Sequence, residues 1–480
     1  METLQLLWIA LATIVFVGIL LRSTRHAPYT LLQPTVEISD PEVARRMLFD
    51  HADAFSNRPT KPFPLDFDAA GRHHSISTKP YGPAWTVIRR SLTAGILHPT
   101  RLGLLEQAQR EAVESFVAGL YAARRGDAGG EVVVRDGLRH AIYTLMARLC
   151  FGEGAVDEHD VRAIDRAQME FLFAYAGTKA VEATRLPRVL YRRRWLRLDA
   201  AFNRVSYLII TLIIAARRRW TERGCGGGGG SVTPYVDSLF VLRFPADDAA
   251  DGDRRGRLLT DAEMAPIVWE FILAGAETVA CSVEWVLAHL VARPEVQEKV
   301  HRQVAGQEEH HLRTTPPYLR AVILECLRMH PALPSIMREV GTEAAAAAAV
   351  GGATAAAADG DATMHFKLNA SDIGRSREAW TDPDEFRPER FLAGGEGEGV
   401  ALVPGPKEVK MVPFGAGRRY CPGAALGMLH VGCFVAAAVR EFEWSPAAKD
   451  GSGVDFTEMD IFFNVMKTQL RARITPRRKT

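Results

Sequence analysis

The sequence predicts a mainly α protein that begins with one apolar anchor helix. Three observations favour this class. Alanine, leucine and arginine recur at helical spacing along most of the chain, alternating apolar stretches typical of strands are few, and the amino terminus opens with a continuous apolar run. The length of 480 residues would suit roughly three domains of average size. No polar break separates two plausible cores, however, so we expect one large helical unit.

Charge and cysteine content narrow the class of protein. The 59 Lys+Arg balance 57 Asp+Glu, which leaves a net charge of +2. This near-neutral balance lacks the basic excess expected of a nucleic-acid-binding protein, and a hydrophobic fraction of 47% argues against disorder. Six cysteines at irregular spacing, without a CxxC pair, predict neither a disulfide scaffold nor a zinc site.

The apolar run at residues 3–21 contains no charged side chain and would span about 28 Å as a helix, close to the hydrocarbon thickness of a bilayer. A cleaved secretory signal is the alternative. It needs positive charge before the run, where Glu2 stands, and a small-residue cleavage site after it, where Arg22 and Arg25 follow. We therefore expect residues 1–25 to form a membrane anchor and the remainder to face the cytosol.

The best-specified helix starts at a capping box. Thr260 and Glu263 are the first and fourth residues of Thr-Asp-Ala-Glu, in which each side chain bonds the backbone N–H of the other residue. The apolar pattern then continues to Pro294, about thirty residues later, so this helix is expected to cross the whole core. A shorter apolar stretch, residues 206–216, favours a buried helix over a membrane crossing.

The most specific chemical signal lies at residues 411–428, MVPFGAGRRYCPGAALGM, where a cysteine precedes a helical pattern. The free N–H groups and the dipole of a helix N-terminus stabilise a thiolate, which can then bind a metal ion as an anion. The spacing resembles the haem-binding signature of the cytochromes P450, Phe-x-x-Gly-x-Arg-x-Cys-x-Gly. The matching residues are Phe414, Gly417, Arg419, Cys421 and Gly423.

This resemblance implies that Cys421 ligates the iron of haem b, iron protoporphyrin IX, and that the thiolate donates electron density which favours O–O cleavage. It implies further that Arg419 reaches a haem propionate and that Phe414 shields the sulfur from water. Gly417 and Gly423 would let the backbone turn close to the porphyrin. Cysteines in the other apolar helical stretches are expected to be buried core thiols; they are Cys150, Cys281, Cys326 and Cys433.

A second match lies upstream of the cysteine. Glu325 and Arg328 of ECLR stand one turn apart on a predicted helix and so share a face. Taken alone, such a pair is a common surface salt bridge. In the cytochromes P450, this pair and the arginine of a downstream PERF motif, here Arg390, form a buried ion triad. The resemblance therefore implies a structural rather than a catalytic role for these three residues.

Three more residues are implied to hold the haem propionates. Trp85 and Arg89 lie four positions apart in a predicted helix, where an indole N–H and a guanidinium can bind one carboxylate. The family pattern usually has a basic residue where Thr86 stands. Arg338, in the segment that follows ECLR, is the third partner that the resemblance implies.

The long helix carries AGAET, which resembles the oxygen-binding segment of the family at Gly275, Glu277 and Thr278. Gly275 would remove side-chain bulk above the iron. The hydroxyl of Thr278 can bond to the carbonyl four residues back, which loosens the helix and admits dioxygen and water. Glu277 and Thr278 would then relay protons to the distal oxygen.

The resemblance covers most of residues 39–444 and points to the plant microsomal group, in particular to plant family eighty-nine. It implies the cytochrome P450 fold, mainly α with a small β subdomain, in a catalytic domain at residues 26–480. The implied activity is a haem-thiolate monooxygenase that inserts one oxygen atom of O2 into a lipophilic small molecule. No strand-flanked G-x-G-x-x-G fingerprint is present, so a partner, NADPH-cytochrome P450 reductase, would supply electrons from NADPH. The implied location is the endoplasmic reticulum membrane, with membrane lipid as a further contact.

Two other functions stay open. The same haem could isomerise or dehydrate a hydroperoxide without O2 or a reductase, although relatives of that kind commonly lack the Glu277 and Thr278 pair. The chain could also be a decayed relative that binds haem poorly. Two departures from the family pattern motivate this second alternative. The segment at residues 22–37 is short, whereas a hinge and the first strands of a small sheet are usual there. An alanine-rich segment at 343–361 replaces a hairpin, although alanine prefers helix.

Overall fold

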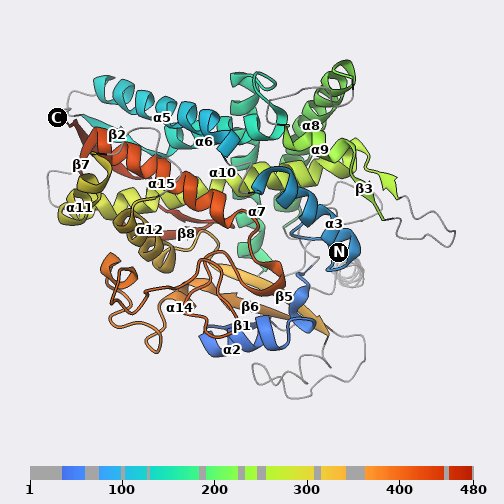
Figure 1. Cartoon of the computed structure of the whole chain (residues 1–480). Coiled ribbons are helices and arrows are strands. Elements are labelled where there is room, and N and C mark those ends of the chain that lie inside the picture. Colours follow the sequence, from blue (N-terminus) through green and yellow to red (C-terminus); the bar gives the residue numbers. More distant parts are fainter. Residues whose placement is uncertain are drawn as a thin grey trace, which may run out of the picture.

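Helices form most of the molecule, and the strands are short (Figure 1). The computed structural model describes residues 35–59, 75–98, 103–126, 130–182, 191–224, 233–245, 256–306, 315–341, 363–447 and 453–477. The anchor predicted at residues 1–25 and the alanine-rich segment at 343–361 lie outside the described residues. Within the described chain, the prediction of a mainly α class with a small β part is confirmed.

The α-helices begin where the sequence supplies suitable first residues. Proline occupies the first position of four of them, α2, α3, α11 and α12, where its missing N–H costs no helical hydrogen bond. The helices are Pro41–Arg45 (α2), Pro83–Leu92 (α3), Glu106–Gly126 (α5), Arg135–Phe151 (α6), Glu158–Glu182 (α7), Arg192–Glu222 (α8), Tyr235–Phe240 (α9), Asp261–Ala292 (α10), Pro294–Val304 (α11), Pro317–Met329 (α12), Ala370–Gly374 (α14) and Ala424–Glu441 (α15). Short helical turns lie at Arg46–Asp50 (η2), Ala54–Ser56 (η3), Thr93–Leu97 (η4), Gly103–Leu105 (η5), Pro388–Phe391 (η8) and Gly417–Arg419 (η9).

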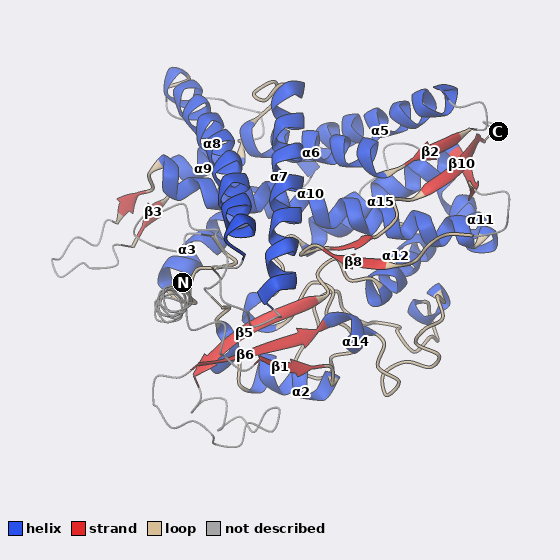
Figure 2. Cartoon of the chain, turned by 180° about the vertical axis from the view of Figure 1, so that it is seen from behind, coloured by secondary structure: helices blue, strands red, loops and turns tan. Residues whose placement is uncertain are grey.

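The strands form small separate sheets. They are Thr35–Ile38 (β1), Glu131–Val133 (β2), Arg243–Phe244 (β3), Arg257–Leu258 (β4), Ser335–Gly341 (β5), Thr363–Asn369 (β6), Phe442–Pro446 (β7), Glu458–Asp460 (β8), Asn464–Met466 (β9) and Arg471–Pro476 (β10). The sheet orders are β1-β6-β5, β2-β10-β7, β3-β4 and β8-β9. In Figure 2 the β1-β6-β5 sheet lies below the helices with α2 beside it, and β2 and β10 lie near the carboxyl terminus.

Helix α10 crosses the middle of the molecule, as its sequence predicts (Figure 1). Its capping box is formed: the Thr260 hydroxyl accepts the Glu263 N–H at 3.3 Å, and the Glu263 carboxylate accepts the Thr260 N–H at 2.9 Å. The helix runs for 32 residues, ends just before Pro294, and contains Pro266. It packs against α6, α8, α12 and α15. Nearly all of its side chains are buried, as expected for a helix that is apolar on every face.

Two hydrophobic cores meet at the loop that leads to Cys421. The larger core is built by the helices around α10. The smaller core lies on the β1-β6-β5 sheet, where Phe55 packs edge-on against Phe366 with ring centroids 5.3 Å apart. Met411 belongs to the larger core, whereas Val412 belongs to the smaller one. The chain before the cysteine is therefore held from both sides.

The two departures from the family pattern leave the neighbouring strands in place. Thr35–Ile38 forms β1 and pairs in parallel with β6. Strands β5 and β6 pair antiparallel in continuous register from Ser335↔Asn369 to Gly341↔Thr363. The strands on both sides of the alanine-rich segment therefore keep the pairing of a hairpin, because their own alternating side chains set the register.

Three helices of the described chain, α8, α10 and α15, are long and apolar enough to cross a membrane by length and composition. In α10 and α15, 83% and 67% of the apolar window is buried inside the protein, so these residues build the core. In α8 the buried share is 39%. The prediction of a short buried helix at residues 206–216 is wrong in part. These residues are the middle of α8, in which Ile209 and Ile213 are buried while Tyr207 and Ile214 are exposed, because the flanking arginines extend the helix rather than end it.

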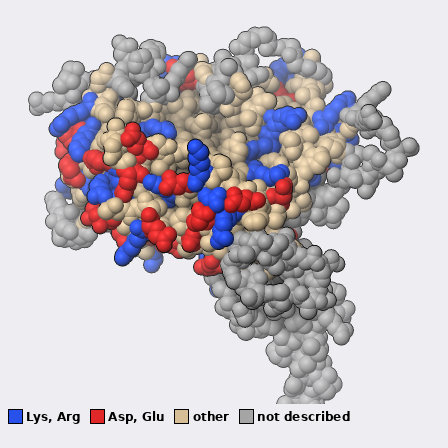
Figure 3. All heavy atoms as spheres, turned by 60° about the horizontal axis from the view of Figure 1, so that its bottom comes forward, with Lys and Arg blue, Asp and Glu red and all other residues tan. Residues whose placement is uncertain are grey.

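Charged side chains of both signs are mixed over the surface. On the face drawn in Figure 3, acidic and basic side chains are interspersed over much of the area, consistent with the net charge of +2. Ion pairs at the surface, such as Arg45 with Glu42, 2.8 Å apart, add little stability because water screens both charges. The surface charges therefore contribute little to the choice of fold.

Candidate active site

Cys421 differs from the other described cysteines in its exposure. Its side chain is partly exposed, whereas the four predicted core thiols are buried, and these are Cys150, Cys281, Cys326 and Cys433. Burial raises the pKa of the Cys421 thiol, while the Gly423 N–H and the nearby Arg89 and Arg58 act in the opposite direction. A bound metal cation would complete the stabilisation of the thiolate, because metal binding displaces the proton of a thiol.

The loop before Cys421 has a backbone that only certain residues permit. The Cys421 N–H donates to the Phe414 carbonyl at 2.8 Å and closes the loop. Gly417 has a φ of 65°, and a Cβ at this position would collide with the Leu48 carbonyl. Helix α15 begins three residues after the cysteine, at Ala424. The sulfur is therefore presented from a rigid loop at a helix N-terminus.

Helix α3 lies against this loop and brings Trp85 and Arg89 to it. Arg89 donates to the Tyr420 carbonyl at 2.7 Å, and its guanidinium lies 4.5 Å from the centroid of the Tyr420 ring. The Trp85 indole N–H donates to the Ile76 carbonyl at 3.0 Å. The guanidinium of Arg419 lies over the Trp85 ring, 4.9 Å from its centroid.

Arg419 is held by backbone oxygens. Its Nε donates to the Ser56 carbonyl at 2.7 Å, and its two terminal nitrogens donate to the carbonyls of Ile76 at 2.9 Å and Lys79 at 2.8 Å. Carbonyl oxygens carry only partial charge, so these bonds orient the guanidinium without neutralising it. Burial, and next the charge of Arg58, lowers the pKa of Arg419 to about 9.

Arg58, Arg338 and Arg419 together form what we call the basic cluster. Burial lowers the pKa of Arg338 strongly, and the charges of Arg58 and Arg419 lower it further. The Arg338 side chain is 1% exposed, and its Nε has no hydrogen-bond partner among the described residues. An unpaired buried cation is costly. The basic cluster is therefore suited to bind carboxylate groups of a ligand.

The middle of α10 carries an accessible stripe of residues on an otherwise buried helix. Ala274 is exposed, and Glu270, Gly275 and Thr278 are partly exposed. Ala274, Gly275 and Thr278 lie four, five and eight residues after Glu270, so all four residues are on the same side of the helix. The Thr278 hydroxyl donates to the Ala274 carbonyl at 2.6 Å. Glu270 accepts the Ile76 N–H, and the Ile76 carbonyl accepts a hydrogen bond from Arg419, two residues before Cys421, so the accessible stripe and the cysteine loop belong to one site.

Glu277 and Gly275 face helix α6. The Glu277 carboxylate accepts hydrogen bonds from Arg139 and Tyr143 and is 2% exposed. Burial alone would lower the pKa of Arg139, but Glu277, Tyr143 and Asp165 together outweigh burial and raise that pKa. A Cβ at Gly275 would overlap the end of the Met146 side chain. The glycine therefore also serves the close packing of α6 against α10.

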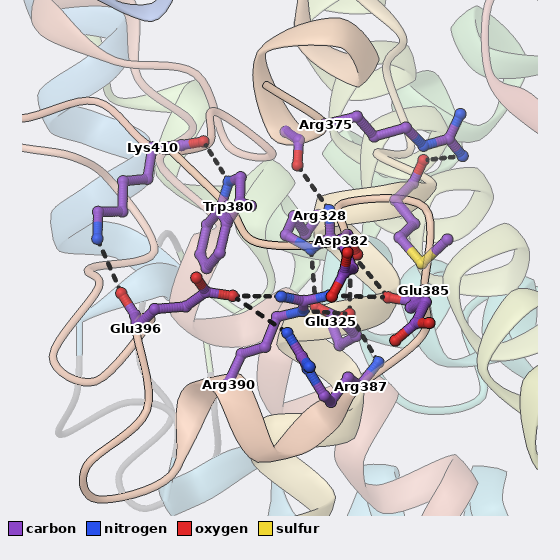
Figure 4. Close-up of polar contacts among 12 residues, drawn as sticks. Glu325, Arg328, Arg375, Trp380, Asp382, Glu385, Arg387, Arg390, Glu396 and Lys410 are labelled. Carbon is purple, nitrogen blue, oxygen red and sulfur yellow. Dashed lines mark hydrogen bonds and ion pairs between the residues drawn. The ribbon is translucent and has the colours of Figure 1, made fainter. Parts of the chain in front are cut away.

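Glu325, Arg328 and Arg390 come together in a buried cluster away from the solvent (Figure 4). Arg328 donates to both carboxylate oxygens of Glu325, at 2.7 and 2.9 Å, and Arg390 donates to the same carboxylate at 3.2 Å. Arg390 also pairs with Glu396, which the sequence analysis did not identify. Each of the two buried guanidiniums thus meets a carboxylate of the chain, while the more exposed guanidinium of Arg387 lies 3.8 Å from Glu396 at the edge of the cluster.

The comparison with known protein families decides what this arrangement is. The family model described as Cytochrome P450 matches residues 29–472. This chain belongs to the cytochrome P450 family. It is accordingly an oxidoreductase of the monooxygenase type, and the family implies a haem whose iron is bound by a thiolate.

Similar proteins include plant members of the family. Cytochrome P450 89A9 of Arabidopsis thaliana is 33% identical over 473 residues, which cover 95% of this chain and 88% of that protein. A 2-hydroxyisoflavanone synthase of Glycyrrhiza uralensis is 27% identical over 448 residues, covering 89% of this chain and 80% of that protein. A solved structure of a zebra fish cytochrome P450 with abiraterone has a TM-score of 0.68 at 20% identity and covers 92% of this chain and 93% of that chain, which shows a shared fold.

The residues of this cytochrome P450 fit a haem. Haem brings one iron that needs an axial ligand and two propionate carboxylates that need cations. The partly exposed sulfur of Cys421 meets the first need. The basic cluster, in which the buried Arg338 Nε lacks a partner among the described residues, meets the second.

Arg58 is the member of the basic cluster that the sequence analysis missed. Asn57 and Glu339 form a β-bridge, in which the Glu339 N–H donates to the Asn57 carbonyl at 3.1 Å. This bridge brings the residue after Asn57 close to the residue before Glu339, that is, Arg58 to Arg338. A bridge between segments so far apart leaves no local signal in the sequence, so only the fold reveals the pair.

Proposed function

We propose that this cytochrome P450 inserts one oxygen atom of O2 into a lipophilic small molecule, with electrons that reach it from NADPH through NADPH-cytochrome P450 reductase. One observation carries the proposal: a partly exposed cysteine shares a site with arginines whose charge the described chain does not neutralise. A cysteine that served only packing would be buried like the four core thiols, and arginines that served only packing would be paired.

In this proposal the chain binds the haem through residues of three segments. The Cys421 sulfur is the iron ligand, with Phe414 beside it and Gly423 donating its N–H to the sulfur. Arg338 and Arg419, with Trp85 and Arg89 from α3, hold the carboxylates. When bound, the haem supplies the activation of dioxygen that a thiolate ligand favours.

The acid and alcohol on α10 are proposed to deliver protons. The Thr278 hydroxyl lies on the accessible stripe, and Glu277 is bonded to Arg139, which also pairs with Asp165 on α7. The Asp165 side chain is 26% exposed. A guanidinium keeps its protons and has no acceptor atom, so these ion pairs position the Glu277 carboxylate rather than relay protons. The groups proposed to transfer protons are Glu277 itself and the Thr278 hydroxyl.

The electron supply and the location rest on the sequence. The chain lacks a nucleotide-binding fingerprint, which supports a separate reductase. The uncharged run at residues 3–21, followed by Arg22 and Arg25, supports an anchor in the endoplasmic reticulum membrane with the catalytic part in the cytosol. Plant relatives such as cytochrome P450 89A9 are consistent with a plant microsomal enzyme.

The spectrum of the reduced carbon-monoxide complex tests the proposal. We expect the haem-loaded wild type to show the strongly red-shifted Soret band of thiolate ligation, and the Cys421→Ser variant to lose that band and all turnover. Cys433→Ala, a change at a buried cysteine in α15, is the matched control and should retain the band. A folded, haem-loaded wild type without the red-shifted band would overturn thiolate ligation.

A second measurement separates the monooxygenase from a hydroperoxide isomerase or dehydratase. The proposal expects O2 and NADPH consumption that depends on added reductase and rises with a lipophilic substrate. Turnover of lipid hydroperoxides without NADPH, together with no reductase-dependent O2 consumption, would contradict it. Among the described residues the β1-β6-β5 sheet is formed and the cysteine loop is closed by its hydrogen bond, which argues against a decayed relative.

A further inference from the structure

The segment Ser75 to Lys79 forms a compact turn between η3 and α3. The Lys79 N–H donates to the Ser75 carbonyl at 3.0 Å, and the hydroxyls of Ser75 and Thr78 bond each other at 2.8 Å. We call this segment the 75–79 turn. It has no regular secondary structure, so its shape depends on the groups that bind its backbone.

Glu270 of α10 binds the turn from one side. One carboxylate oxygen accepts the Ile76 N–H at 2.6 Å, and the other accepts the Ser77 N–H at 2.8 Å as well as the Ser77 hydroxyl. Three donors and no acceptor converge on this carboxylate, which is the arrangement an ionised carboxylate requires. Burial raises the pKa of Glu270, but the bonds from Ser77 and Ile76 and the charge of Arg58 oppose this change.

The other side of the same turn holds the proposed haem ligands. The Ile76 carbonyl accepts both the Trp85 indole N–H at 3.0 Å and an Arg419 nitrogen at 2.9 Å, and the Lys79 carbonyl accepts a second Arg419 nitrogen at 2.8 Å. The N–H of Ile76 therefore points to α10 while its carbonyl serves α3 and the cysteine loop. A movement of the Ile76 backbone would therefore displace Trp85 and Arg419 together.

We propose that Glu270 is a positioning residue, which fixes the 75–79 turn on α10 and thereby sets Trp85 and Arg419 for the haem carboxylates. The part that concerns haem rests on the proposed function, whereas the anchoring of the turn does not. Glu270 acts through the backbone of the turn, so its removal affects how the prosthetic group is held rather than the chemical step.

Hydrogen exchange of the full-length, haem-loaded protein tests the anchoring. Glu270→Gln keeps the size of the side chain but places an NH2 donor opposite a backbone donor. We expect exchange of the peptide that contains Ile76 and Ser77 to accelerate by about tenfold or more, the loss expected for hydrogen bonds to a charged acceptor. Glu284→Gln is the control, because Glu284 lies on the same helix, α10, and also accepts a backbone N–H, that of Leu470 at 2.9 Å.

The control should leave exchange of the 75–79 turn unchanged even if it lowers the melting temperature. Unchanged exchange of the turn in Glu270→Gln, or equal acceleration in both variants, would overturn the anchoring.

Release of haem to an excess of apomyoglobin tests the positioning. We expect Glu270→Gln to release haem about tenfold faster than wild type, Glu284→Gln to release it at the wild-type rate, and Glu270→Asp, which keeps the charge, to recover part of the difference. Faster exchange of the turn with unaltered haem release would refute the positioning role. If Glu270→Gln does not fold, the comparison of Glu270→Asp with wild type gives the same two readouts. A wild type without the thiolate spectrum would overturn the proposed function separately, since the exchange result does not depend on that ligation.

Discussion

Two groups of buried arginines in this protein differ in how their charge is met. Around Glu325, the guanidiniums of Arg328 and Arg390 are paired with two carboxylates, those of Glu325 and Glu396. Backbone carbonyls such as that of Gly374, 2.8 Å from Arg328, satisfy further N–H groups. This cluster is complete within the chain (Figure 4).

The basic cluster is incomplete by the same measure. Burial lowers the pKa of Arg338, the charges of Arg58 and Arg419 lower it further, and the Arg338 Nε is buried without a partner among the described residues. The acidic side chain that acts on Arg58 and Arg419 is Glu270, which is already bonded to the backbone of Ile76 and Ser77. The difference teaches that matched buried charges indicate a structural role, whereas surplus buried charge indicates the place of an ionic ligand.

Removal of the Glu325 carboxylate should cause the largest loss of stability. Glu325→Gln leaves Arg328 and Arg390 buried against one remaining carboxylate, so we expect a loss of about 3–5 kcal/mol in the free energy of unfolding. Urea unfolding of the haem-free protein measures it, with the exposed change Glu42→Gln as the control, which should cost far less. A loss at Glu325 no larger than at Glu42 would show that the matched cluster does not stabilise the fold.

Neutralising substitutions of one arginine from each cluster should differ in their effect on stability. Arg338→Met removes a surplus buried cation, so the haem-free protein is expected to gain about 1 kcal/mol or stay unchanged, while haem affinity falls about tenfold or more. Arg328→Met should instead destabilise the haem-free protein by about 3 kcal/mol or more. Urea unfolding and haem titration give the two quantities. Equal destabilisation by both substitutions would remove the distinction between the clusters.

The smallest effect on the free energy of unfolding is expected at Glu396, at the edge of the cluster around Glu325, and it depends on pH. The Glu396 side chain is 27% exposed. Burial raises the pKa of its carboxyl, but hydrogen bonds from Thr381 and Arg390 outweigh burial. The pKa therefore lies below the ordinary value of 4.5. A carboxyl whose pKa is lower in the folded state stabilises the fold above its unfolded pKa, and this contribution is lost as the pH falls below 4.5. Glu396→Gln should therefore cost about 1 kcal/mol at neutral pH and progressively less in acid, as followed by urea unfolding at several pH values. A cost that does not change with pH would argue against the charge of Glu396 as its origin.

Local patterns in the sequence were enough for the elements that short-range rules control. The capping box at Thr260 and the stop at Pro294 predicted α10, because caps and prolines act within a few residues. The spacing of Glu325 and Arg328 predicted a shared helix face. The same reasoning failed for α8, where the arginines that border the apolar stretch were taken as its limits although arginine favours helix.

Which side chains contact each other in the active site depended on packing between segments that are distant in the sequence. The chain itself specified a cysteine before a helix, an acid and an alcohol on a long apolar helix, and arginines near both. The fold alone decided that Glu270 meets Ile76, 194 positions earlier, that Met146 fills the notch at Gly275, and that Arg58 stands beside Arg338. Helix caps and turns are governed by neighbours along the chain, whereas the partner of a buried donor is whichever acceptor the packed core brings within about 3 Å.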